Sequence, residues 1–231
     1  MFNTIEVRNL TKKYGKFTAL DNVNINIAGG KIIGLLGPNG SGKTTFFKCL
    51  SGLLTYDGDV YIGGKPIGVE TKKLVSFLPE RTYLDLSMSV EELFLFFAEF
   101  YDDFDMERAY YLLSVLGVSA KAKMKTLSKG TKEKVQLIAV MARRALVYLL
   151  DEPIGGVDPA AREFIIKTIL TRVNEGATII ISTHLIRDVE EILDEYIFIN
   201  GSKFVSYGSV KQVHEQGKTV DEIFREVFRC F

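Results

Sequence analysis

The residues of this chain best suited to chemistry form one glycine-rich run that ends in a lysine and two threonines. Its spacing is G-x-x-x-x-G-K-[ST], in which glycines let backbone N–H groups converge on phosphate oxygens. The lysine adds a positive charge for the β- and γ-phosphates, and the first threonine hydroxyl can ligate Mg²⁺. The spacing therefore predicts a site for a nucleoside triphosphate. The run consists of Gly37, Pro38, Asn39, Gly40, Ser41, Gly42, Lys43, Thr44 and Thr45.

The sequence on both sides of this phosphate loop supports the prediction. An apolar stretch over 31–36 predicts a buried strand before the loop, and 45–50 predicts the first turns of a helix after it. The phosphates would then lie at a helix N-terminus, where the helix dipole is positive. The alternative is an ordinary glycine-rich turn, which the flanking strand and helix disfavour.

Two adjacent carboxylates follow a second apolar run, over 146–150. Ligands of open α/β sheets gather at the carboxyl ends of strands, so Asp151 and Glu152 are expected beside the phosphates. Asp151 is a candidate Mg²⁺ ligand, through water. Glu152, on the opposite side of an extended chain, would polarise the water that attacks the γ-phosphate. The alternative is a solvated strand end, but a phosphate loop requires a metal ligand from another strand.

A histidine ends a third apolar run, over 179–182. A lone histidine is usually structural or solvent-exposed. His184 follows a predicted core strand at the edge where the triphosphate is expected, which favours a functional role.

A fourth segment, over 127–131, precedes a predicted helix. Ser128 in this position most often serves only as an N-cap. However, Lys129, Lys132 and Lys134 crowd a helix N-terminus, where cations oppose the helix dipole, and an anion bound there would remove the conflict. The alternative is that these lysines extend into water at little cost.

The composition sets limits on the class of protein. The chain has 231 residues, 47% of them hydrophobic, and a formal net charge of zero. The charge balance gives no sign of binding to nucleic acid. Cys49 and Cys230 are the only cysteines, which suits a reducing cytoplasmic interior. No apolar run approaches the roughly 18 residues of a membrane-spanning helix, so membrane attachment would require a partner.

Strand and helix patterns alternate along most of the chain, which predicts a doubly wound α/β core. Helical periodicity dominates from about residue 89 to 144. We therefore expect a core from 1–80 and 145–231, with a helical lobe inserted at 81–144. Helices are also expected at 160–173 and 185–193.

Five motifs occur in a fixed order along the chain: GPNGSGKTT, LSKGT, YLLDEP, GGVDP and STH. Together they resemble the nucleotide-binding subunit of an ATP-binding cassette (ABC) transporter, over nearly the whole chain. The resemblance implies a P-loop NTPase core with a mixed, mainly parallel sheet, an N-terminal antiparallel β subdomain and an inserted α-helical lobe. It also implies ATP and Mg²⁺ as ligands.

The resemblance further implies a head-to-tail pair of ATPase subunits, as a homodimer or heterodimer. Each ATP would lie between the phosphate loop of one subunit and the LSKGT segment of the other. Ser128 and Gly130 would contact the γ-phosphate across the interface, and Asp158 would cross beside them. Tyr14 matches the aromatic residue on which adenine stacks, with an unliganded surface tyrosine as the alternative. Lys43, Glu152 and His184 would be the catalytic residues.

The sequence departs from the family pattern at two motifs. The usual signature of the family is LSGGQ. In this chain Lys129 replaces its first central glycine and Thr131 replaces its glutamine. The loop into the helical lobe usually carries a glutamine, and Glu80 stands at that position. A carboxylate there can still reach Mg²⁺ or water, but it adds negative charge near the phosphates.

The resemblance implies an ATPase that powers a transmembrane permease subunit from the inner, cytoplasmic face of the cell membrane. The length of the chain is similar to that of subunits of bacterial exporters for drugs or antimicrobial peptides. Two rivals remain: a soluble ABC-type ATPase that does not transport, and a P-loop kinase for a small molecule. The expected docking surface for the permease comprises 81–86 together with Phe96, Phe97, Phe100 and Tyr101, with packing inside the lobe as the alternative for each ring.

Overall fold

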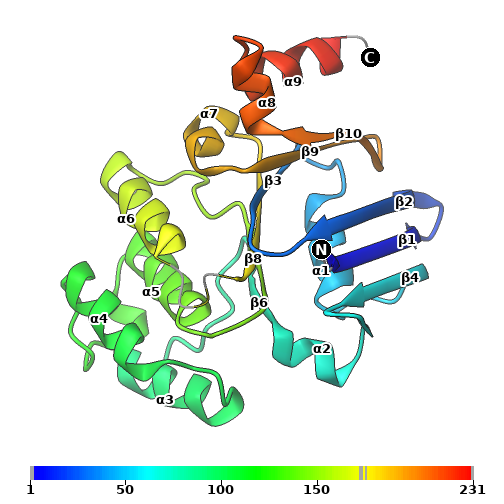
Figure 1. Ribbon diagram of the computed structural model, residues 1–231. Helices are drawn as coiled ribbons and strands as arrows, with labels where there is room; N and C mark the ends of the chain where they lie inside the picture. Colours follow the sequence, from blue (N-terminus) through cyan, green and yellow to red (C-terminus); the bar gives the residue numbers. More distant parts are fainter. Residues whose placement is uncertain (1–2, 172–173, 175, 230–231) are drawn as a thin grey trace.

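The strands form two sheets within the residues that the computed structural model describes, namely 3–171, 174 and 176–229 (Figure 1). An antiparallel sheet has the order β2-β1-β4-β5, and a mixed sheet has the order β10-β9-β3-β8-β7-β6. The first sheet contains β1 (Asn3–Tyr14), β2 (Phe17–Ala28), β4 (Asp57–Ile62) and β5 (Lys65–Pro66). The second contains β3 (Ile32–Leu36), β6 (Val75–Leu78), β7 (Val147–Asp151), β8 (Thr178–Thr183), β9 (Glu195–Asn200) and β10 (Lys203–Ser209).

The mixed sheet is parallel except for β10, which runs antiparallel to β9. Every residue of β3, β7 and β8 is buried. This burial on both faces explains why these strands are continuous apolar runs in the sequence. Because they are parallel, their carboxyl ends meet at one edge, where the phosphate loop, Glu152 and His184 follow them.

The helices cover both faces of the mixed sheet. The α-helices are α1 (Lys43–Leu50), α2 (Val69–Leu74), α3 (Val90–Phe100), α4 (Met106–Leu116), α5 (Lys129–Met141), α6 (Pro159–Leu170), α7 (Ile186–Val189), α8 (Val210–Glu215) and α9 (Val220–Arg229). Side chains of α1 share one apolar cluster with both sheets, and those of α5 to α9 share another with the opposite face of the mixed sheet. Two short 3₁₀ helices span Met124–Thr126 and Glu190–Ile192.

The segment that contains α3, α4 and α5 has an apolar cluster of its own. Helix α3 begins with a capping box, in which Ser89 Oγ accepts from Glu92 N and Glu92 Oε2 accepts from Ser89 N. Asp105 caps α4 and Gly117 ends it in the left-handed conformation. These local signals make 90–116 a helical hairpin beside the sheet core (Figure 1).

The α/β fold class is confirmed, but two element boundaries differ from the expectation. Helix α6 ends at Leu170, and Val173 lies outside the described residues. The helix expected over 185–193 is a four-residue α7 followed by a 3₁₀ turn. The elements after residue 200, namely β10, α8 and α9, had no counterpart in the sequence prediction. Among the described residues no helix combines the length and apolarity needed to cross a bilayer.

A buried arginine joins the helical segment to the sheet core. The Arg143 guanidinium is 2% exposed and pairs with Asp103, with Nε 2.9 Å from Oδ1 and Nη2 3.1 Å from Oδ2. It also donates to the carbonyl oxygens of Lys73 and Val75, both at 2.7 Å, and lies over the ring of Tyr101. This arginine therefore bonds to the backbone that enters β6 and to a carboxylate of the helical segment at once.

We expect Asp103→Ala to lower the free energy of unfolding by about 3 kcal/mol, because it leaves the Arg143 charge buried without its partner. The matched control is Arg144→Ala, which breaks the exposed pair with Asp105 and should cost about 0–1 kcal/mol. Urea unfolding of both variants measures the difference. Equal losses would mean that Asp103 contributes no more than a surface ion pair.

Candidate nucleotide and metal site

The phosphate loop has a backbone shape that requires glycine at two positions. Gly42 has φ of 113°, a left-handed value, and a Cβ there would lie 2.6 Å from the carbonyl oxygen of Ala19. A Cβ on Gly37 would lie 2.3 Å from the carbonyl oxygen of Ile199. The loop thus turns tightly from β3 into α1, which begins at Lys43. Its N-terminal N–H groups are left to face a ligand.

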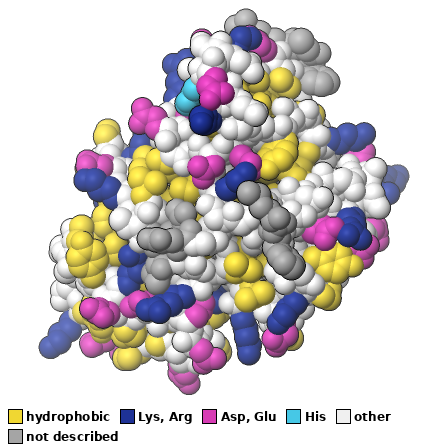
Figure 2. Space-filling view, in the orientation of Figure 1, with side chains coloured by type: hydrophobic (Ala, Val, Ile, Leu, Met, Phe, Trp, Pro, Cys, Tyr) yellow, Lys and Arg dark blue, Asp and Glu magenta, His cyan; other side chains and the backbone are white. Residues whose placement is uncertain are grey.

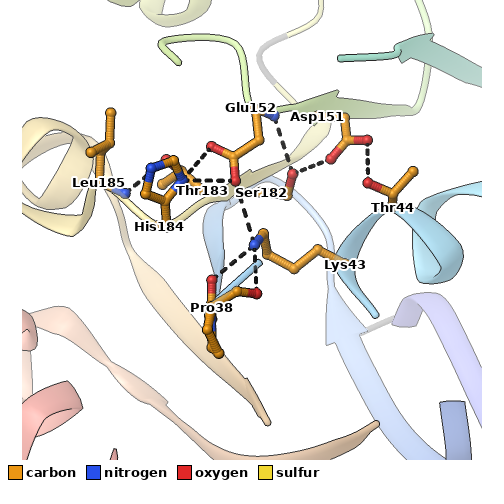
Figure 3. A network of polar contacts seen from close by, with 10 residues as sticks. Pro38, Lys43, Thr44, Asp151, Glu152, Ser182, Thr183, His184 and Leu185 are labelled. Carbon is orange, nitrogen blue, oxygen red and sulfur yellow. Dashed lines mark hydrogen bonds and ion pairs between the residues drawn. The ribbon is translucent and has the colours of Figure 1, made fainter. Parts of the chain in front are cut away.

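Lys43 is a buried cation held by its own loop. Its side chain is 6% exposed, and Nζ donates to the carbonyl oxygens of Gly37 (2.8 Å) and Pro38 (3.2 Å). Nζ also lies 3.4 Å from Glu152 Oε1 (Figure 3). These partners neutralise and solvate a charge that would otherwise be costly to bury. The ammonium group is therefore already positioned where the loop turns.

Ser41 gives an independent test of whether the loop fits an oxyanion. Its Oγ is buried and has no hydrogen-bond partner within the described part of the chain. A buried hydroxyl without a partner carries an energetic penalty, which a phosphate oxygen accepting from it would relieve. The donors of this loop, namely amide N–H groups, a hydroxyl and an ammonium, are those that a phosphate chain requires.

Asp151, the last residue of β7, connects the start of α1 to the end of β8. Its Oδ2 accepts from Thr44 Oγ1 at 2.8 Å, and its Oδ1 accepts from Ser182 Oγ at 2.5 Å. Burial raises the pKa of Asp151 above its usual range, and the bonds from Ser182 and Thr44 oppose that rise. The nearby carboxylates of Glu152 and Glu80 raise the pKa further. Thr44 and Asp151 thus form an oxygen pair of the kind that Mg²⁺ binds.

Glu152 lies between Lys43 and His184. His184 Nδ1 is 3.2 Å from both carboxylate oxygens of Glu152, so one acid contacts a lysine and an imidazole at once (Figure 3). The expectation of an extended backbone at Glu152 was wrong: its φ is 48°, in the left-handed region. Ser182 holds this turn, because Glu152 N donates to its carbonyl oxygen at 3.0 Å and to its Oγ at 3.2 Å. A strained residue that local bonds fix in this way is typical of functional sites.

These side chains surround a cavity of about 690 Å³. The predicted residues that line it are Asn39, Gly40, Gly42, Lys43, Thr44, Thr45, Glu80, Asp151, Glu152 and His184. Gly37, Pro38 and Ser41 shape the loop behind this lining. Glu80 reaches the cavity from the loop that follows β6. The carboxyl ends of β3, β7 and β8 and the loop after β6 therefore meet at one cavity.

The aromatic residue that lines the cavity is Phe17, which the sequence prediction missed. Tyr14 is its partner across the β1–β2 hairpin and does not line the cavity. The Tyr14 ring instead lies 5.3 Å from Lys12 Nζ. Phe17 is 60% exposed, which is unusual for a phenylalanine, but nothing in the sequence marked it as exposed. Both rings belong to one hairpin, but only Phe17 faces the hollow in this conformation.

Ser128 and Gly130 do not line this cavity, whereas Lys129 does. Ser128 caps α5, since its Oγ accepts from Thr131 N at 3.2 Å, so the structural interpretation of Ser128 holds within one chain. Lys129 is almost fully exposed and lies 3.9 Å from Glu133. The Asp158 side chain likewise caps α6, where its Oδ1 accepts from Ala161 N at 2.8 Å. A role for these residues across an interface stays a prediction.

Gln136 is a second lining residue that the sequence prediction missed. Its side chain is 2% exposed, and Oε1 has no partner within the described residues. The signal was a single amide inside the apolar run over 135–141 of α5. Gln136 therefore places an amide group of α5 at the wall of the cavity.

Comparison with known families agrees with this geometry. The family model described as "ABC transporter" matches residues 20–155, which is more than half of the chain. The SkfA peptide export ATP-binding protein SkfE of Bacillus subtilis is 33% identical over 96% of this chain and 95% of its own length. The manganese transport system ATP-binding protein MntB of Listeria monocytogenes is 29% identical over 93% of each chain.

A solved structure described as the ATP binding subunit of an ABC transporter superposes with a TM-score of 0.88. It is 26% identical and covers 97% of this chain and 99% of its own. The fold, the cavity and the family match concern the same residues: β3, the phosphate loop and the end of β7 all lie within the matched range. The chain therefore belongs to the ABC transporter ATP-binding family and is an ATPase.

Proposed function

We propose that this chain hydrolyses ATP as one of two head-to-tail subunits, in a homodimer or heterodimer that drives a membrane transporter, most simply an exporter. The observation that carries the proposal is the contact of Glu152 with both Lys43 and His184 beside a phosphate loop. The relatives named for peptide export and manganese transport support transport as the class, and the first of these supports export.

In the proposed mechanism, Lys43 transfers its hydrogen bonds from loop carbonyls to the β- and γ-phosphates. Its attraction to Glu152 then weakens, which leaves that carboxylate free to accept the proton of the attacking water. His184, 3.2 Å from Glu152, orients the carboxylate and the γ-phosphate. Thr44 and Asp151 would hold Mg²⁺, with Glu80 as a further ligand, and Mg²⁺ would supply charge neutralisation of the phosphates.

Across the proposed dimer interface, Ser128 and Gly130 of one subunit contact the γ-phosphate bound by the other. The first turn of α5 carries no acidic residue, and Lys129 extends from it into solvent. An anion next to this turn would meet favourable partial charges and a lysine. The adenine would stack on the β1–β2 hairpin, on Tyr14 or on Phe17.

We propose that the permease docks on the 81–144 lobe, with the chain at the cytoplasmic face of the membrane. Tyr83, Leu86, Phe96 and Phe100 are exposed, whereas Phe97 is buried in the lobe. Hydrophobic side chains lie among acidic and basic ones over this part of the surface, at the lower left of Figure 2. Exposed aromatic residues rimmed by charge are typical of a protein interface.

The direct test is phosphate release from Mg²⁺-ATP by the full chain, followed by co-purification with a multi-span membrane protein. Transfer of phosphate to an acceptor other than water would favour a small-molecule kinase. Hydrolysis with no membrane partner, in a screen of membrane extracts, would favour an ABC-type ATPase that does not transport.

We expect Glu152→Gln to retain ATP binding but to lower kcat by about 10²–10⁴-fold, the range for loss of a general base. The variant should accumulate as an ATP-bound dimer, because the amide keeps its shape but cannot take the proton. Steady-state turnover and ATP binding measure the two effects. The control is Glu163→Gln, an exposed acid of α6. Normal turnover in the site variant would remove Glu152 from the mechanism.

We expect Asp151→Asn to raise the Tm of the nucleotide-free protein at pH 7 and to abolish the further rise that Mg²⁺-ATP causes. The folded pKa of Asp151 lies above its unfolded value, so the ionised carboxylate costs stability above the folded pKa and costs nothing below the unfolded one. The gain should therefore vanish as pH falls through that window. About 1 kcal/mol corresponds to roughly 2–4 °C for a chain of this size.

The asparagine can keep both hydroxyl partners of Asp151, accepting from one and donating to the other. The control is Asp102→Asn, a change of an exposed carboxylate. Calorimetry at pH 7 and pH 4, with and without Mg²⁺-ATP, separates the two effects. A lower Tm at pH 7 would show that the ionised Asp151 stabilises the empty site.

We expect Lys129→Glu to weaken ATP-driven dimerisation, because it places an anion beside phosphate at a helix N-terminus. The matched control is Lys125→Glu, the same charge change on the neighbouring 3₁₀ helix. Both changes are made in the Glu152→Gln background to prevent turnover, and sedimentation with ATP measures the dimer fraction of each. If both variants dimerise as the parent does, Lys129 only faces solvent.

A further inference from the structure

The helix that follows His184 is too short to hold its own position. Helix α7 has four residues, and its N-terminus has no side-chain cap. A single helical turn is unstable in isolation, so its placement depends on its neighbours. The described residues give His184 no side-chain hydrogen bond except that to Glu152. The position of the imidazole is therefore set by the backbone between β8 and α7.

Helix α6 holds α7 on one side. Arg162 Nη1 lies 2.5 Å from Asp188 Oδ1, and both side chains are partly buried. Within the described part of the chain, Asp188 is the side-chain hydrogen-bond partner of the Arg162 guanidinium, and Arg162 Nε is buried without a partner. Arg162 also donates its backbone N–H to the carbonyl of Asp158, at the start of α6. The pair thus connects the first turn of α6 to the turn after His184.

Helix α9 contacts α7 on its other side, and the two lie near each other in Figure 1. Arg187 Nε donates to Asp221 Oδ2 at 2.7 Å. Directly after α7, the Glu190 carboxylate is nearly buried: Oε1 accepts from Val220 N at 2.7 Å and lies 2.8 Å from His214 Nε2. A carboxylate at the N-terminus of α9 is favoured by the helix dipole, which makes this a strong anchor.

We propose that α7 is a positioning element for His184, and that Asp188 and Glu190 are the positioning residues that hold it from its two sides. The proposal rests on the proposed role of His184 at the phosphate. Loss of either anchor lets α7 shift, and His184 moves relative to Glu152. A displacement of about 1 Å in a catalytic group lowers turnover without changing how the phosphate loop binds ATP.

The first test is steady-state ATP hydrolysis by the full-length Asp188→Asn and Glu190→Gln variants. We expect kcat to fall about tenfold with KM within about twofold of the parent value, since the phosphate loop and the hairpin are untouched. Asp188→Glu keeps the charge and should restore most of kcat. The matched control is Glu191→Gln, the exposed neighbour of Glu190, which should change neither constant.

The second test is a double-mutant cycle with His184→Ala. If Asp188 acts through His184, Asp188→Asn has no further effect on kcat once the imidazole is gone. If Asp188 acts independently of His184, the double variant instead shows the product of the two separate fold-losses in kcat, which is an additive loss in activation free energy. An additive loss, or an unchanged kcat in Asp188→Asn, overturns the proposal.

A spectroscopic readout separates this proposal from the function on which it rests. The chain has two histidines, so the imidazole signals of His184 and His214 can be assigned with the His184→Ala variant, which removes one of them. We expect Asp188→Asn to shift the His184 signal and Glu191→Gln to leave it in place. If the His184 signal does not move in Asp188→Asn, the positioning role is overturned, even when the parent chain hydrolyses ATP as proposed. Absence of ATP hydrolysis by the parent chain, with the signal shifted as expected, would contradict the proposed function alone.

Discussion

The arrangement of this protein depends on one buried cation. The Lys43 ammonium group is almost completely removed from water, and it survives there because two loop carbonyls and Glu152 replace the solvent. To supply those partners, the phosphate loop must fold back on itself, and β7 must end at the same sheet edge as β3, with β8 between them. The two glycines without room for a Cβ, the left-handed turn at Glu152 and the order of the mixed sheet all serve this requirement.

Negative charge is the second constraint on the same cavity. Its lining contains four carboxylates and two lysines, of which only Lys43 is buried. The carboxylates are those of Glu80, Glu133, Asp151 and Glu152, and the second lysine is Lys129. Hydroxyl donors from Thr44 and Ser182 offset part of this repulsion at Asp151. The cavity thus carries more carboxylates than lysines, which suits a ligand that arrives with its own metal ion.

The fold and the central residues of the site could be predicted from the sequence because their signals are local. Continuous apolar runs marked the buried strands, and the polar residues that follow those runs meet wherever the strands are parallel. The backbone of Glu152 could not be predicted, because its conformation depends on Ser182, which is 30 positions away. Phe17 and Gln136 were missed because lining a cavity is a property of packing. Helix α9 carries an apolar face over 223–228, but the core it covers is formed by distant segments.

The joint at Arg143 has a consequence for how such proteins vary. On the side of the sheet core, the guanidinium bonds to main-chain carbonyls, and on the side of the helices it bonds to a carboxylate from the same inserted segment. Main-chain acceptors are present whatever the side chains are. A lobe that brings Asp103 and Arg143 with it could therefore make the same bonds to any sheet core in which the backbone from α2 into β6 follows the same path. Chimeras that exchange whole lobes between relatives need no compensating substitution at this joint.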